Sequence, residues 1–153
     1  MRNYSKTARS VIAVGSTGLL IAGFGLLWSS SPRAQGEGGC SNRTLKGDYA
    51  SAIDGQLLAG PVTGILRGVN MSRFDGDGHS TGVDFVTING VAPGDWAPVT
   101  GTYEVSPDCT GQATLYHEFG PPLELRFVIG NHGTLIHSVV LGNATGSTAT
   151  KVN

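Results

Sequence analysis

Charged residues are scarce in this 153-residue chain, at 14% of the total, and the basic ones are spread thinly. No cluster of lysine and arginine occurs after residue 36. Proteins that bind nucleic acid or anionic membranes concentrate such residues to meet the phosphates. We therefore expect neither nucleic acid nor a membrane surface as a partner of the mature protein.

The sequence also has no motif that assigns a reaction. It has no glycine-rich phosphate loop, and no two carboxylates have neighbours typical of a glycosidase pair. No two of the four histidines have the close spacing typical of a zinc site, and the cysteines are expected to be occupied in a disulfide. Catalytic residues therefore cannot be assigned, and no cofactor or metal site is predicted.

The N-terminal segment contains one long run without charge. Arg2, Lys6 and Arg9 come first without any acid, and no charged residue occurs from Val11 to Trp28. A basic head, an apolar middle and a small-residue exit are typical of a helical secretory signal peptide. We predict a signal peptide over residues 1–36, with cleavage after residue 34 as the alternative. A run of 18 residues is at the short edge of a membrane span, so an uncleaved anchor is the other reading.

Removal of residues 1–36 changes the charge of the product. Four of the ten basic residues and none of the eleven acids lie in that segment, so the remainder carries six basic residues, eleven acids and a net charge of −5. The protein is then secreted or periplasmic. We divide it into a flexible lead-in over residues 37–43 and one domain over residues 44–153, which is enough chain for a single core.

The only two cysteines, Cys40 and Cys109, both follow the predicted signal peptide. Disulfides persist in exported proteins, so two cysteines in such a chain indicate a bridge between them. Two free buried thiols are the alternative. A bridge would join the start of the domain to its middle.

The rest of the chain alternates between β-type runs and turn residues, without a sustained apolar period of 3.6 residues. Asn89-Gly90 and Asp75-Gly76 supply the positive φ that tight hairpins need. The expected strands are Lys46–Gly55, Val62–Phe74, His79–Ile88, Val99–Val105, Gly111–Glu118, Leu123–Ile129, Thr134–Val140 and Thr145–Val152.

Apolar and polar residues alternate along several of these strands, which is typical of antiparallel sheets with one wet face. Leu123, Leu125, Phe127 and Ile129 share one face, for example. Closing such a meander removes its exposed edges, and glycines within the strands suit tight curvature. We predict an all-β, eight-stranded antiparallel up-and-down barrel, with a two-sheet β-sandwich as the alternative.

Asp75-Gly76-Asp77-Gly78 begins like a calcium loop. That pattern needs glycine at the sixth position and glutamate at the twelfth, where this chain has Ser80 and Val86. A hairpin turn accounts for the same residues, so the segment is read as a turn.

Several runs of this sequence resemble a known group. They are the segment from Cys40 to Tyr49, the turn Asp75-Gly76-Asp77-Gly78, Gly101-Thr102-Tyr103, and the segment from Pro107 to Gly111. Together they resemble uncharacterised exported bacterial proteins with an allene oxide cyclase-like, calycin-like barrel domain. The resemblance covers most of residues 40–152. It implies an eight-stranded barrel and a Cys40–Cys109 disulfide, and it carries over no catalytic residue.

Candidate ligand-binding residues are polar side chains set among apolar ones on the expected strands. His117 follows Leu115, and His137 lies between Leu135 and Val139. If those faces point into the barrel, the imidazoles line its interior. The full candidate set is Tyr49, Arg67, Tyr103, His117 and His137. Hydrogen-bonded core or rim residues are the alternative reading, because sequence alone does not fix the inward direction.

Two functions follow from this picture. The first is an exported barrel without catalysis that binds a small apolar molecule or has a structural role. The second is an isomerase or cyclase that uses the barrel interior as an apolar reaction cavity, where holding the substrate in a reactive conformation supplies much of the catalysis. The oligomeric state cannot be read from the sequence.

Overall fold

The computed structural model describes residues 39–60, 62–118 and 120–152. The predicted signal peptide lies outside these residues, as do the first two residues of the predicted lead-in. Within the described ranges the chain is all-β, with eight strands and two short 3-10 helices. None of the helices described is long and apolar enough to cross a membrane.

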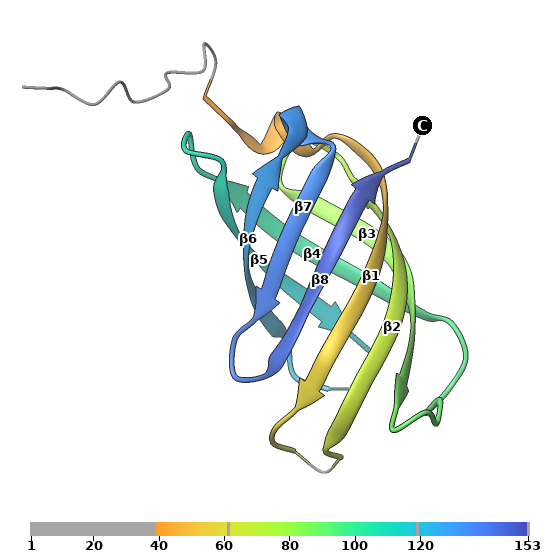
Figure 1. The fold of residues 1–153 in the computed structure, drawn as a ribbon. Helices are drawn as coiled ribbons and strands as arrows, with labels where there is room; N and C mark the ends of the chain where they lie inside the picture. The colour runs from red at the N-terminus through yellow and green to blue at the C-terminus, as the bar shows by residue number, and fades with distance from the viewer. Residues whose placement is uncertain (1–38, 61, 119, 153) are drawn as a thin grey trace, which may run out of the picture. The chain divides into compact units, whose positions relative to one another are not determined.

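Each strand pairs antiparallel with the next along the chain, and the last pairs with the first, so the sheet closes into a barrel (Figure 1). The predicted up-and-down barrel is confirmed, and the β-sandwich alternative is wrong. The observed bounds differ from the predicted ones by at most two residues. They are Gly47–Leu57 (β1), Gly64–Phe74 (β2), His79–Ile88 (β3), Ala97–Val105 (β4), Thr110–His117 (β5), Leu123–Gly130 (β6), Leu135–Val140 (β7) and Ala144–Lys151 (β8).

One end of the barrel, where β1 begins, is closed by packed side chains. Leu45 of helix η1 (Asn42–Leu45) and Tyr49 are fully buried. The rings of Tyr49, Phe74 and Tyr103 meet edge to face, with centroids 5.2 and 5.1 Å apart. Such aromatic contacts add to the stabilisation from burial. The remaining buried apolar residues of this core are Val105, Phe127, Ile136 and Ala149.

A disulfide joins Cys40 to Cys109, with their Cα atoms 5.0 Å apart, as predicted. The backbone N–H of Cys40 also donates to the carbonyl of Pro107 at 3.2 Å. Asn42 accepts a hydrogen bond at Oδ1 from the N–H of Val105 at 2.8 Å. The segment that we expected to be a flexible lead-in is therefore bonded, from Cys40 onward, to the end of β4 and the turn that follows it.

The turn Asp75-Gly76-Asp77-Gly78 joins β2 to β3 at the closed end. Asp75 accepts hydrogen bonds at Oδ1 from the backbone N–H groups of Asp77 at 2.7 Å and His79 at 3.0 Å. These bonds lower the pKa of the Asp75 carboxyl below its usual value. In the described part of the chain, no group of three or more histidine, cysteine, aspartate or glutamate side chains could hold a metal ion.

Candidate functional site

The barrel interior has one packed half and one half that side chains fill only partly. Strand alternation fixes the inward residues, because they share a face with buried ones such as Tyr49 and Phe127. Toward the end opposite η1, the large apolar inward residues are partly exposed except Val99, which is buried at 4% exposure, and none belongs to the packed core. We call these residues the open half: Ile53, Leu57, Leu66, Val86, Ile88, Leu115, Leu123, Leu125 and Val140.

Two titratable side chains face inward among these apolar residues. Asp84 of β3 is only 8% exposed, and His117 is the last residue of β5. Asp84 Oδ2 lies 3.6 Å from His117 Nδ1, which is an ion-pair contact but longer than a hydrogen bond. His117 Nε2 is buried without a hydrogen-bond partner among the described residues. A buried nitrogen without a partner costs about 1–3 kcal/mol, so its presence here needs an explanation.

Burial also changes the acidity of Asp84. Removal from water raises the pKa of the Asp84 carboxyl above its ordinary value, and a positive charge on His117 offsets part of that rise. Asp84 thus holds its proton to higher pH than an exposed aspartate does. A carboxyl and an imidazole in contact could exchange a proton with a bound molecule.

Four other inward polar side chains have hydrogen-bond partners within the barrel. Ser72 Oγ donates to Asn70 Oδ1 at 2.6 Å, and Asn70 Nδ2 donates to the carbonyl of Val83 at 3.1 Å. The hydroxyls of Ser138 and Ser147 lie 2.8 Å apart. These groups are satisfied by the barrel itself, so His117 differs from them in having a nitrogen left over.

Tyr49 and Tyr103, predicted as ligand-binding, point inward but lie in the packed closed end. The hydroxyl of Tyr49 donates to the carbonyl of Gly133. The hydroxyl of Tyr103 accepts from the N–H of Gly76 at 2.9 Å and donates to the carbonyl of Asn42 at 3.3 Å. Burial raises the pKa of both phenols, which keeps them neutral donors. Both side chains therefore hold the closed end together and do not line the open half.

Arg67 and His137 point away from the interior, so the expectation that they line it is wrong. Both are exposed, and His137 Nδ1 lies 3.1 Å from the hydroxyl of Thr148 on the outer surface. In both strands apolar residues occupy both faces, as with Leu135 and Ile136. The alternation therefore could not tell the inner face from the outer one.

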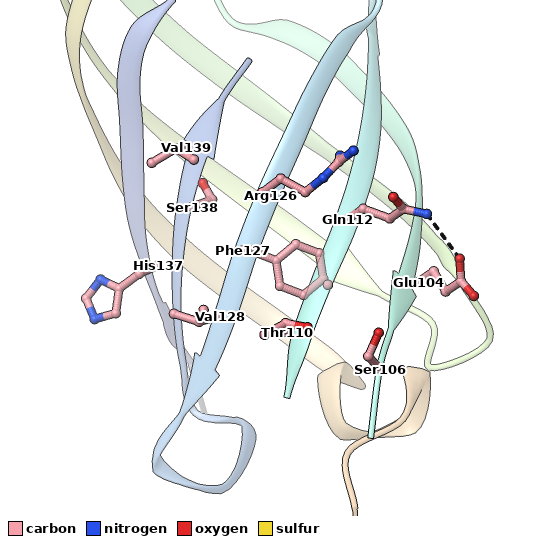
Figure 2. Close-up of a pocket in the computed structure, with 11 residues that line it drawn as sticks. Glu104, Ser106, Thr110, Gln112, Arg126, Phe127, Val128, His137, Ser138 and Val139 are labelled. Atoms are coloured by element: carbon pink, nitrogen blue, oxygen red, sulfur yellow. Dashed lines mark hydrogen bonds between the residues drawn. The ribbon is translucent and has the colours of Figure 1, made fainter. Parts of the chain in front are cut away.

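An outer groove with a volume of about 610 Å³ crosses strands β4 to β7 (Figure 2). Its polar groups already have partners, because Gln112 donates to Glu104 at 3.2 Å and Arg126 donates to the carbonyl of Leu125 at 2.9 Å. In Figure 2 the ring of His137 points away from Arg126 and Gln112. The groove is lined by Glu104, Ser106, Thr110, Gly111, Gln112, Arg126, Phe127, Val128, His137, Ser138 and Val139. We therefore take the open half of the barrel interior, and not this groove, as the candidate site.

Sequence reasoning missed Asp84 and one motif. Gly82, Asp84 and Val86 are two residues apart along β3 and therefore share one face. That spacing could have predicted that Asp84 faces inward. Gly78 to Gly82 reads Gly-x-Ser-x-Gly, the pattern of a hydrolase nucleophile turn, with Ser80 at its centre. That motif needs a turn from a strand into a helix, whereas Ser80 lies within β3 and is only 8% exposed. Ser80 is therefore no candidate nucleophile.

Comparison with known proteins assigns no function to the candidate site. The similarity to allene oxide cyclase-like barrels rests on the sequence motifs and stays a prediction. No protein-family model, curated protein or solved structure matches this chain.

Proposed function

We propose that this protein is an exported binding protein that holds a small, mainly apolar molecule in the open half of its barrel. The observation that carries the proposal is the set of large apolar side chains that face inward and stay partly exposed. Leaving so much apolar surface in contact with water costs free energy, which a bound apolar molecule would recover. Apolar walls with a few polar groups are typical of small-molecule sites.

The loops at the open end support the same function. They carry apolar side chains that are largely exposed and that no strand packing requires. These are Leu58 at 58%, Val62 at 52%, Val91 at 70% and Leu141 at 49% exposure. An apolar rim lets an apolar molecule leave water gradually as it enters.

His117 supplies a polar anchor for the ligand. Its Nε2 is buried and has no hydrogen-bond partner within the described ranges, so the imidazole would have to shift for that nitrogen to meet a ligand. A ligand with one hydroxyl or carbonyl group would then gain a hydrogen bond that the empty protein lacks. We therefore propose a ligand with an apolar body and one polar group.

Two features support an exported location. The Cys40–Cys109 disulfide fits an oxidising compartment, and the first 36 residues have the pattern of a signal peptide. The protein would thus meet its ligand in the periplasm or outside the cell.

A neighbouring pair of tryptophan substitutions tests the site. Val140 faces inward, and Val139 on the same strand faces outward with 56% exposure. The probe is N-phenyl-1-naphthylamine, an apolar dye that brightens when it leaves water. The wild type and Val139→Trp should bind it saturably, and Val140→Trp should not, because the indole fills the open half. Equal binding by both variants would disprove the interior site.

A second candidate function, isomerase or cyclase, is favoured by one observation. The Asp84–His117 contact places a carboxyl against an imidazole in a largely apolar setting, which suits general acid–base catalysis. The molecule that co-purifies with the protein, identified by native mass spectrometry, would be incubated with the wild type and with His117→Gln. Conversion to an isomer by the wild type alone, with binding kept in both, would support catalysis. Binding without conversion by either protein would leave the non-catalytic function.

A further inference from the structure

The outward-facing residues of β1, β2 and β3 include a group of apolar side chains that are exposed to water. Val69 is 48% exposed, Met71 44% and Val83 41%. The register places Val69 between Ala52 and Phe85, and Met71 between Ala50 and Val83. These outward residues therefore form two adjacent apolar rows across three strands.

The start of β4 extends both rows. Trp96, just before that strand, is 54% exposed and packs on Phe85 with ring centroids 5.6 Å apart. Pro98 lies opposite Val83. We call the resulting surface the apolar face, which consists of Ala50, Ala52, Val69, Met71, Val83, Phe85, Trp96 and Pro98.

The apolar face ends at the start of β4. After Pro98, the outward positions of β4, β5 and the start of β6 are mostly polar, and exposed apolar residues occur again at Val128 of β6 and Val139 of β7. The mostly polar positions are Thr100, Thr102, Glu104, Gln112, Thr114, Tyr116, Glu124 and Arg126. A contiguous exposed apolar patch on one side of a protein marks an interaction surface.

Charged pairs border the apolar face at both ends of β1 and β2. At the open end Asp54 lies opposite Arg67 in the register. At the closed end Asp48 lies opposite Arg73, with Asp48 Oδ1 3.8 Å from Arg73 Nη1. In both pairs the acid is on β1 and the base is on β2.

This arrangement is self-complementary under one symmetry. A two-fold axis in the contact plane, parallel to the strands and between β1 and β2, places β1 of one copy over β2 of the other without reversing the two ends. Asp54 then faces Arg67 of the second copy, and Asp48 faces Arg73 of the second copy. An axis across the strands would instead bring Arg67 over Arg73 and Asp54 over Asp48, which repel.

We propose that the β1–β2 part of the apolar face is the interface of a two-fold symmetric homodimer, in which a second copy of this chain covers Ala50, Ala52, Val69 and Met71. Such an interface is isologous, as most homodimer interfaces are. Its centre consists of Val69 and Met71 against Ala52 and Ala50 of the second copy, with the charge pairs at the rim. This proposal does not depend on ligand binding in the interior.

Sedimentation equilibrium of the exported, disulfide-bonded protein tests the proposal. The wild type should sediment as a dimer. Val69→Glu should weaken the dimer by about tenfold or more, because the carboxylate would be buried without a partner. The matched control is Val128→Glu, which makes the same change at a residue 50% exposed on β6 and should leave the dimer intact. Equal melting temperatures would establish that both variants fold.

A charge exchange tests the axis. Asp54→Arg alone places arginine over Arg67 of the second copy and should weaken the dimer several-fold. Adding Arg67→Asp should restore it, since opposite charges then face each other again. A monomeric wild type, a dimer that Val69→Glu leaves intact, or a double variant that stays weak would overturn the proposal. Binding of the monomer to neutral phosphatidylcholine vesicles, lost in Val69→Glu, would overturn it in favour of a lipid surface.

Discussion

The side chains of Asp84 and His117 meet inside the barrel although their strands, β3 and β5, are not neighbours. The strand between them, β4, contributes Val99, which pairs with Gly82 on one side and His117 on the other. Asp84 Oδ2 and His117 Nδ1 are 3.6 Å apart as a result. The contact depends on the curvature of the closed barrel, which turns the inner faces of the two strands toward each other.

The pH dependence of stability should reveal the buried carboxyl. Burial raises the folded-state pKa of Asp84 above the ordinary aspartate value of 3.8, so the favourable contribution of the protonated form is fully present below that value. It is lost as the pH rises through the folded-state pKa. We expect the unfolding free energy of the wild type, relative to Asp84→Asn, to fall over that range, as measured by denaturant titrations at several pH values.

The control for this prediction is Asp54→Asn, the same substitution on the exposed outer side of β1. It should not reproduce the trend. A wild type that gains stability relative to Asp84→Asn as the pH rises would mean that attraction to His117 outweighs the cost of burial.

Tyr49→Phe should destabilise the closed end by about 1–3 kcal/mol, because it leaves the carbonyl of buried Gly133 without its hydroxyl donor. The ring contact with Phe74 would remain, so the loss reports the hydrogen bond. Urea denaturation measures the change. Tyr116→Phe, at a residue 46% exposed, should be nearly neutral, and equal losses in the two variants would contradict the assignment.

Replacing both Cys40 and Cys109 by serine should lower the unfolding free energy. The bridge joins residues 69 positions apart, and a loop of that length gives about 4 kcal/mol in the chain-entropy model. The measurement is denaturant unfolding of the double variant beside the oxidised and the reduced wild type. The double variant should match the reduced protein. A double variant as stable as the oxidised protein would show that the hydrogen bonds of Cys40 and Asn42 suffice.

Gly111→Ala should destabilise the barrel by about 1–3 kcal/mol through overpacking. A Cβ atom at this position would lie 2.2 Å from Phe127 Cζ and 2.6 Å from the carbonyl oxygen of Glu104. The matched control is Gly130→Ala, where the nearest atom is 3.7 Å away. Thermal unfolding of the two variants compares them directly, and a stable Gly111→Ala protein would mean that the Phe127 ring can move aside.

The barrel could be predicted because its strands are separated by residues that strongly favour tight turns. Asn89 and Gly90, for example, have positive φ values of 52° and 81°. Where one face was clearly apolar, as in the strand with Leu123 and Leu125, the inward direction was also predicted correctly. These signals are local, so they can be read from neighbouring residues.

The candidate site was less predictable because it depends on which strands face each other across the interior. The sequence left the inward direction of His117 open, and its contact Asp84, which belongs to a different strand, was missed. His137 and Arg67 were assigned to the wrong face because both sides of their strands carry apolar residues. The outward apolar residues of β2 form the apolar face, so the feature that misled the prediction is itself a property of the surface.

The closed end also determines how the barrel can be attached to other structures. The described chain enters there at Cys40 and leaves there at Val152, whose N–H donates to the carbonyl of Asp48. Both ends of the described chain are therefore on the side away from the open half (Figure 1). A fusion partner or affinity tag at either terminus should leave the mouth unobstructed, so the protein can be immobilised by either end in binding measurements.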